Sequence, residues 1–209
     1  MDADRRQHQQ QHRDRQHRTQ PRHGQRHTHL QHRPQGHRQR ATVLNGSTYL
    51  KTATPSVDTS QAYSVAAWVK ITNVSGYQAF VTQNGTARGS YYLQYSPAFN
   101  AWAFVAPSTD TNPPSAYYAA YAAPSPQPNT WTHLVATYDP ATKAMTLYVN
   151  GTFAGAGTNP TPWNAAGATT IGAAVTGSSV SNQVTGSVSD VRSYPYALTP
   201  EQVAALYAS

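Results

Sequence analysis

The sequence of residues 41–209 predicts an all-β fold, an antiparallel sandwich of two sheets followed by a short C-terminal helix. Three observations lead to this prediction. Short segments rich in Tyr, Val and Thr recur along the chain. Gly, Pro, Asn and Asp separate nearly all of them, and no helical pattern lies between them. Consecutive strands of this kind pair antiparallel, and about twelve of them are enough for two stacked sheets.

Residues 63–71 give the clearest strand pattern, because an apolar set alternates with a face that carries Trp68. The apolar set is Tyr63, Val65, Ala67, Val69 and Ile71. Further strands are expected at residues 78–82, 91–95, 101–106, 117–121, 130–138, 144–149, 152–155, 169–172 and 186–193.

A hairpin and the terminal helix have the sharpest local signals. Asn150-Gly151 stands between two apolar segments and favours a type I′ turn, and the Asp139-Pro140 turn upstream adds a third strand to this meander. Near the C-terminus, Thr199 precedes Pro200 and is followed three residues later by Gln202. This spacing is typical of a helix N-terminus with a capping box, so the last ten residues are predicted to be helical.

The first forty residues differ sharply in composition from the rest. They hold ten Arg, eight His and ten Gln, and their net charge is +7, whereas residues 41–209 carry five basic and five acidic side chains. With Leu30 as nearly their only large apolar side chain, residues 1–40 are expected to form a disordered arm. Three hypotheses for it stay open: non-specific nucleic-acid binding by its arginines, Zn²⁺, Ni²⁺ or Cu²⁺ binding by its histidines, and a leader without function.

Length and composition restrict the class of protein to which the chain can belong. Residues 41–209 are long enough for one domain with a substantial core. The chain has no cysteine, which excludes disulfides and thiolate metal sites, and it has no apolar run of the length that spans a bilayer. No signal peptide is visible at its N-terminus.

Several blocks in order resemble a known family. They are Leu44-Asn45-Gly46, Tyr49-Leu50, residues 63–70, residues 130–139, residues 147–151 and residues 186–199. Over about residues 41–208 the chain resembles a LamG-like jelly-roll domain of the concanavalin A-like lectin/glucanase superfamily. The resemblance implies a jelly-roll sandwich and an extracellular bacterial protein, but a fold that hosts lectins, glycosidases and spacers does not determine the function.

Catalysis is not expected. Glycoside hydrolysis needs two carboxyl groups on either side of the scissile bond. The acidic residues of 41–209 are Asp58, Asp110, Asp139, Asp190 and Glu201, and the Glu-x-Asp-x-x-Glu pattern of glucanase relatives is missing. The single histidine of this segment, His133, lies within a strand pattern and is expected to be a half-buried strand residue.

Binding fits the residues better, because sugars stack on aromatic rings while polar groups orient them. Residues 91–121 are dense in aromatic side chains, and alternation sends one set to the core and leaves the other for a ligand. For any single tyrosine a place in the core or on a solvated face stays open. The ligand-binding candidates are Tyr92, Trp102, Tyr118, Trp163 and Asn164.

A calcium site is implied by the resemblance, since many relatives bind one Ca²⁺ through Asp and Asn oxygens. The matching residues are Asn45 and Asp190. Relatives often have two consecutive Asp where this chain has Ser189-Asp190, which leaves one carboxylate fewer for the ion.

The sequence therefore leads to three hypotheses. The first is a non-catalytic module that binds carbohydrate or a glycoconjugate. The alternative is a structural or protein-interaction spacer without a sugar ligand, and a glycoside hydrolase comes third. An exposed Trp102 or Trp163 beside polar groups favours the first, and burial of both favours the second. If Trp68 and Trp131 are core residues, replacing either by Ala should cost about 3–5 kcal/mol.

Overall fold

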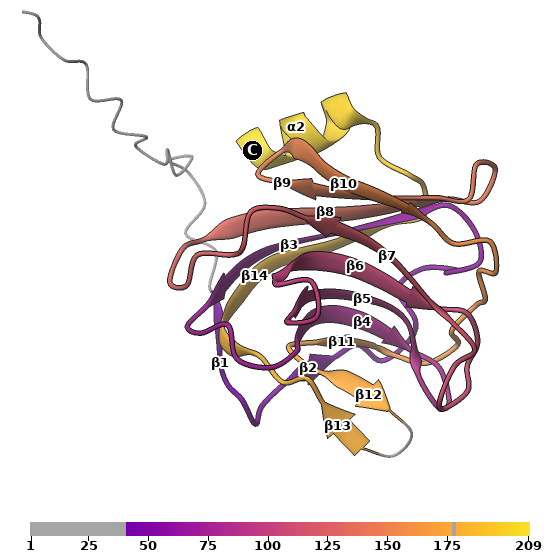
Figure 1. Ribbon diagram of the computed structural model, residues 1–209, viewed down its shortest axis with the longest axis horizontal. Helices are drawn as coiled ribbons and strands as arrows, with labels where there is room; N and C mark the ends of the chain where they lie inside the picture. Colours follow the sequence, from indigo (N-terminus) through magenta and orange to yellow (C-terminus); the bar gives the residue numbers. More distant parts are fainter. Residues whose placement is uncertain (1–40, 177–178) are drawn as a thin grey trace, which may run out of the picture. The chain divides into compact units, whose positions relative to one another are not determined.

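The computed structural model describes residues 41–176 and 179–209, which form two stacked six-stranded sheets (Figure 1). The predicted arm over residues 1–40, with its nucleic-acid and metal hypotheses, lies outside the described residues. Sheet A has the order β1-β14-β3-β8-β9-β10. Its strands are β1 (Thr42–Asn45), β14 (Thr185–Tyr194), β3 (Tyr63–Ile71), β8 (Thr132–Asp139), β9 (Ala144–Val149) and β10 (Thr152–Thr158).

Sheet B has the order β2-β11-β4-β5-β6-β7. Its strands are β2 (Leu50–Lys51), β11 (Thr169–Ile171), β4 (Gln78–Asn84), β5 (Gly89–Ser96), β6 (Ala101–Pro107) and β7 (Tyr117–Ala122). A separate hairpin pairs β12 (Ala174–Thr176) with β13 (Ser179–Ser181), and helix α2 (Pro200–Ala208) closes the chain. All strand pairs in the described residues are antiparallel.

The predicted antiparallel sandwich with a short C-terminal helix is confirmed. The capping box at Thr199 forms: its hydroxyl accepts the N–H of Gln202, whose side-chain oxygen accepts the N–H of Thr199 at 2.9 Å. The short strands β1, β2, β12 and β13 were not expected. They have two to four residues each, which is too short for an alternating pattern to be recognised.

The inner faces of the two sheets pack their large apolar side chains against each other. The predicted apolar face of residues 63–71 lies in this core. Tyr63 of sheet A joins the layers, because its ring centroid lies 5.4 Å from that of Tyr91 and 6.2 Å from that of Phe104, both in sheet B. Burial raises the pKa of the Tyr63 phenol well above its usual value, so the ring stays neutral.

The outer face of sheet A is covered by α2 (Figure 1). Beneath the helix, the ring of Trp68 lies 5.1 Å from that of His133 and 5.6 Å from that of Tyr207. His133 is 2% exposed, more fully buried than expected, and burial lowers its pKa from 6.5 to about 4, an effect that nearby Asp190 partly opposes. The imidazole is therefore neutral at physiological pH and belongs to the packing of α2.

The two sheets approach each other closely where β10 lies over β7. A Cβ atom placed on Gly155 would lie 2.1 Å from the carbonyl oxygen of Tyr121, and one placed on Gly157 would lie 2.2 Å from that of Ala119. Only glycine allows this approach at these two positions. The contact fixes strand β7, whose outer face carries Tyr117 and Tyr121.

The condition under which Trp68→Ala or Trp131→Ala would cost about 3–5 kcal/mol, a place in the core, is not met. Both are half-buried: Trp68 stacks under α2, and the Lys70 ammonium lies 5.3 Å from the Trp131 ring centroid. Trp102 is instead 4% exposed and packs against Phe80 between the sheets. The reason is that Trp68 is on the side of β3 that faces away from sheet B, and Trp131, directly before β8, lies beside Lys70 of that same side.

Because Trp102 is buried and Trp131 is half-buried, replacing each by alanine should have unequal effects on stability. Trp102→Ala should lower the free energy of unfolding by about 3–5 kcal/mol, because it opens a cavity in the core. Trp131→Ala should cost about 1 kcal/mol, since solvent can fill the space that its half-exposed ring leaves. Urea denaturation of both variants would check the difference, and equal losses would show that the faces are assigned incorrectly.

Candidate functional site

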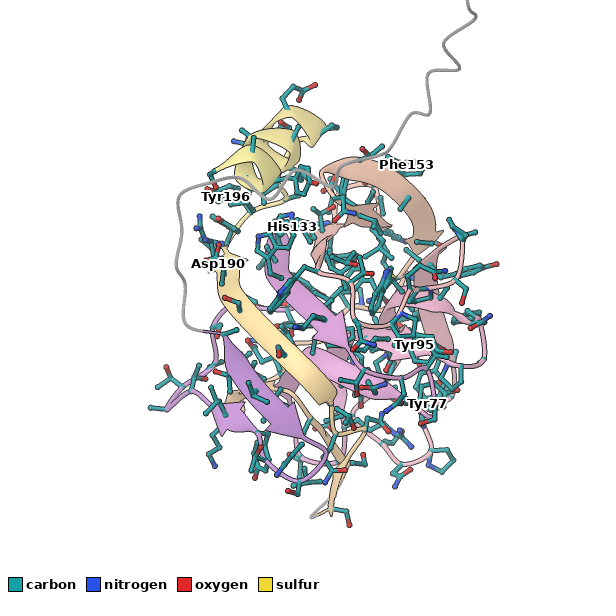
Figure 2. The ribbon with its side chains drawn as sticks, turned by 90° about the vertical axis from the view of Figure 1, so that its left-hand side faces the viewer. Tyr77, Tyr95, His133, Phe153, Asp190 and Tyr196 are labelled. Atoms are coloured by element: carbon teal, nitrogen blue, oxygen red, sulfur yellow. The ribbon has the colours of Figure 1, made fainter. Side chains whose placement is uncertain are left out.

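A pocket of about 480 Å³ lies on the outer face of sheet B, a size typical of ligand sites. We call it the sheet B pocket. It is lined by Tyr77, Arg88, Tyr92, Gln94, Ser96, Ala98, Phe99, Val105, Tyr117, Ala119, Ser181 and Asn182. Figure 2 shows Tyr77 well away from His133 and Asp190, which belong to sheet A.

Strand alternation explains why these side chains share one face. On β5, Tyr91, Leu93 and Tyr95 enter the core, so Tyr92, Gln94 and Ser96 must point outward. The strand register places Val105 opposite Tyr92 and Ala119 opposite Val105, and these three form the floor. Val105 and Tyr92 on the floor are buried, whereas the rings at the margin are exposed, and together they make the face concave.

Aromatic rings form the rim. Tyr77 is 43% exposed, Phe99 42% and Tyr117 52%. The ring of Phe99 is stacked parallel to that of Tyr121, with a centroid distance of 4.4 Å. Exposed aromatic rings around a hollow are unusual for a purely structural surface, because each leaves apolar area in contact with water. They are well suited to stacking against a flat apolar face of a ligand.

Polar groups of the pocket come from β5, the β12–β13 hairpin and the loop before β5. Gln94 and Ser96 lie on β5, and Asn182 follows β13. The hydroxyl of Tyr92 accepts the N–H of Gly89 at 3.0 Å. Burial raises the pKa of Tyr92, while the Gly89 bond and the nearby Arg88 lower it in part, so this hydroxyl stays protonated.

Arg88 is held at one end of the pocket by residues of the β6–β7 loop. Its Nε donates to the carbonyl oxygen of Thr111 at 3.2 Å, and an Nη donates to Oδ1 of Asn112. Its guanidinium carbon lies 5.6 Å from the ring centroid of Tyr117. Two hydrogen bonds and a cation–π contact therefore fix the plane of the guanidinium group.

Asp110 fixes the backbone from which Arg88 extends. Its carboxylate accepts the N–H groups of Thr86, Ala87 and Arg88 at 2.7, 2.8 and 2.8 Å. Burial alone would raise the pKa of Asp110, but the three N–H donors outweigh it and lower this pKa below its usual value. The loop is ordered by the charged form of this side chain.

The pocket offers binding groups and little catalytic chemistry. None of its described lining residues is Asp, Glu, His or Cys. The paired carboxyl groups of glycoside hydrolysis are thus missing from the lining. Across residues 41–176 and 179–209, moreover, no group of three or more His, Cys, Asp or Glu side chains comes together as a metal site would need.

Of the five ligand-binding candidates from the sequence, the structure places Tyr92 in the pocket. Trp102 points into the core, and Tyr118 packs against the core from β7 while Tyr117 and Tyr121 point outward. The register of β5, β6 and β7 explains this, because Trp102 lies opposite the inward-pointing Tyr95.

Trp163 and Asn164 lie outside the pocket lining and hold a loop in place. The Trp163 indole donates to the carbonyl oxygen of Pro107 at 2.9 Å, and Oδ1 of Asn164 accepts the N–H of Thr59 at 3.3 Å. Trp163 is half-buried. Its indole N–H thus ties this loop to the last residue of β6.

Sequence reasoning missed Arg88 and most of the rim. Arg88 lies in a turn, and nothing in its local sequence shows that residues 110–112 lie beside it. Tyr117 had a weak signal, because the alternation of 117–121 separates it from Tyr118 without showing which of the two faces the core.

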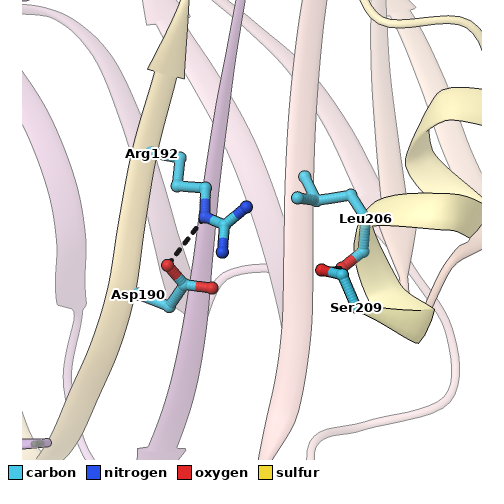
Figure 3. A network of polar contacts seen from close by, with 4 residues as sticks. All are labelled: Asp190, Arg192, Leu206 and Ser209. Carbon is cyan, nitrogen blue, oxygen red and sulfur yellow. Dashed lines mark hydrogen bonds and ion pairs between the residues drawn. The ribbon is translucent and has the colours of Figure 1, made fainter. Parts of the chain in front are cut away.

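The two calcium candidates do not come together. Asn45 lies opposite Thr185 in the β1–β14 register, five residues from Asp190, so the two positions are separated by about 15 Å along the strand. Oδ1 of Asn45 accepts the N–H and hydroxyl of Ser47, and Oδ1 of Asp190 pairs with Nε of Arg192 at 2.7 Å (Figure 3). These residues do not fit a shared Ca²⁺ site.

Comparison with known proteins agrees with the sandwich. A sequence model described as the concanavalin A-like lectin/glucanases superfamily matches residues 44–204. No curated protein matches the chain in sequence. In the described residues, no helix has the length and apolar character needed to cross a bilayer.

Solved structures share the fold at low sequence identity. The native heptameric SAP-like pentraxin of Limulus polyphemus is similar with a TM-score of 0.64 and 16% identity, over 80% of each chain. The CBM40 of Ruminococcus gnavus IT-sialidase has a TM-score of 0.60 and 13% identity, over 80% of this chain and 96% of that one. Domain 4 of a GH43 extracellular arabinanase from Geobacillus stearothermophilus, solved in complex with arabinotriose, has a TM-score of 0.54 and 23% identity. The match covers 80% of this chain and 76% of that one.

The role of Asp110 generates a stability prediction. Asp110→Asn should lower the free energy of unfolding by about 1–2 kcal/mol, because a neutral amide replaces a charged acceptor of three N–H groups. Because the folded-state pKa of Asp110 is lowered, its contribution is present above about pH 4 and is lost as the pH falls through that pKa.

Thermal melts of the wild type and of Asp110→Asn between pH 7 and pH 3 would measure this difference in stability. Asp58→Asn is the matched control, since the Asp58 carboxylate accepts a single backbone N–H, from Ser60. An Asp110→Asn variant as stable as the control variant would contradict the assigned role.

Proposed function

Because this chain belongs to the concanavalin A-like lectin/glucanase superfamily, we propose that its β-sandwich is a non-catalytic carbohydrate-binding module whose glycan lies in the sheet B pocket. The observation that carries the proposal is the combination of exposed rings and polar side chains around one hollow. Sugars present both an apolar face and hydroxyl groups, and the pocket offers partners for both.

The pocket lies along β5, from Arg88 before the strand to Phe99 after it. Strand β5 has eight residues and is therefore about 25 Å long. On β7, Tyr117 and Tyr121 are four residues apart on the outer face, which separates them by about 13 Å. A site of this length fits an oligosaccharide better than a single sugar.

Two of the structural neighbours support this proposal. One is a CBM40 and another was solved in complex with arabinotriose. The neighbours also include a domain of an extracellular enzyme, and we propose that this module likewise belongs to an exported protein that binds a glycan or glycoconjugate. The lining of the pocket, without carboxyl or imidazole groups among its described residues, supports binding without catalysis.

The spacer hypothesis has one observation in its favour. Trp102 is buried and so offers no ring to a sugar, whereas Trp163 is half-buried and lies outside the lining of the sheet B pocket. The proposal therefore depends on Tyr77, Phe99 and Tyr117, and it must be tested on them.

The test compares rim variants by isothermal titration calorimetry against a panel of neutral, carboxylated and sulfated plant and host oligosaccharides. Phe99→Ala or Tyr77→Ala should weaken binding of any oligosaccharide that titrates by about 5- to 10-fold, because each removes one stacking face. The matched control is Phe153→Ala, which removes an exposed ring from β10 in sheet A (Figure 2) and should leave the affinity unchanged. Rim variants that bind as tightly as the control, or a panel without any binding, would refute the proposal in favour of a spacer.

A further inference from the structure

Arg88 is the single charged side chain among the described residues that line the sheet B pocket. The other polar lining groups are neutral amides and hydroxyls, so the pocket carries one positive charge at one end. Its position is not explained by the binding of a neutral sugar, because amide and hydroxyl groups are sufficient to orient hydroxyl groups.

The charge of Arg88 is not neutralised by a carboxylate. Within the described residues, Asp190 and Arg192 form the one ion pair, and they lie in sheet A. The acceptors of Arg88 are a carbonyl oxygen, of Thr111, and an amide oxygen, of Asn112. A guanidinium group has five N–H donors, so the bonds to Thr111 and Asn112 do not use all of them, and the hydroxyl of Tyr92 is a further neighbouring acceptor inside the pocket.

The carboxylate of Asp110, which accepts the backbone N–H of Arg88, faces the backbone of residues 86–88. It accepts three N–H groups there and is not part of the pocket lining. Asp110 therefore positions Arg88 through its main chain and leaves the guanidinium side open. The ring of Tyr117 and the Asn112 contact hold that side in one orientation before any ligand arrives.

We infer that Arg88 binds an anionic group of the glycan, a carboxylate or a sulfate, at the Tyr117 end of the pocket. This inference rests on the proposed function, since it assigns the ligand class of the same site. A planar guanidinium group matches the paired oxygens of either anion, and the hydrogen bonds it forms with them are stronger than those with a hydroxyl group. The anionic sugar then sets the direction in which the oligosaccharide lies along β5.

A purely structural role of Arg88 makes a different prediction. If Arg88 serves only to hold residues 111 and 112, its replacement lets the loop move. The affinities for neutral and anionic ligands then fall by the same factor. If it binds an anion, replacement removes the preference for the anionic ligand and leaves the neutral one bound. The two roles are separated by the ratio of affinities rather than by either affinity alone.

The experiment uses the full chain and three forms of one oligosaccharide: neutral, carboxylated and sulfated. Calorimetry should show the wild type binding at least one anionic form about 10- to 100-fold more tightly than the neutral form. Arg88→Gln should reduce this ratio to about 1, and Arg88→Lys should retain part of it, because a point charge lacks the planar fork. Lys51→Gln, which removes an exposed cation from strand β2, is the matched control and should keep the wild-type ratio.

Salt provides a second readout that requires no variant. Raising the ionic strength should lower the affinity for the anionic oligosaccharide several-fold and leave the affinity for the neutral one unchanged. The inference would be overturned, while the proposed function stands, if the wild type bound the neutral and anionic forms equally tightly. The same holds if the Arg88→Gln variant kept the wild-type ratio of anionic to neutral affinity. Failure of all three forms to bind would overturn both. Whether the carboxylated or the sulfated form gains more identifies the anion.

Discussion

The packing of aromatic rings between the two sheets determines which side of each strand is left for a ligand. Tyr63 contacts Tyr91 and Phe104 across the interior and so fixes the inward face of β5 and β6. Because side chains alternate along a strand, a core that holds Tyr91 must present Tyr92 to the outside. A slip of one residue would bury the floor of the pocket and expose the core, so the site depends on the same interaction as the fold.

Backbone contacts then shape the ends and the edge of the pocket. Glycines at 155 and 157 allow β10 to lie on β7, which carries the outward tyrosines, and Asp110 orders the turn that carries Arg88. These groups touch no ligand themselves. They hold rings and a guanidinium group in one arrangement, which reduces the entropy that binding would otherwise cost. Affinity in this module is thus expected to be sensitive to residues outside the pocket.

The sequence was sufficient for the sandwich, for the inward face of residues 63–71 and for the capped helix, because each depends on a local pattern. It was insufficient for strand 117–121, which has tyrosines on both faces and alanine at the other positions, so its hydrophobicity is the same on either side. The site of Arg88 could not be predicted either. It depends on contacts between two loops more than twenty residues apart in the chain, and no periodic pattern reports such contacts. The separation of Asn45 from Asp190 likewise follows from strand register.

The most direct test of the account is to map where an oligosaccharide binds. In the ¹⁵N-labelled protein, titration with an oligosaccharide that shows binding should shift the amide resonances of β5, of β7 and of the turn before β5. Amides of β14, which belongs to sheet A, and of α2, which covers the outer face of sheet A, should stay unchanged. Shifts confined to sheet A, or to the loop of Trp163, would contradict the claim that the outer face of sheet B is the binding surface.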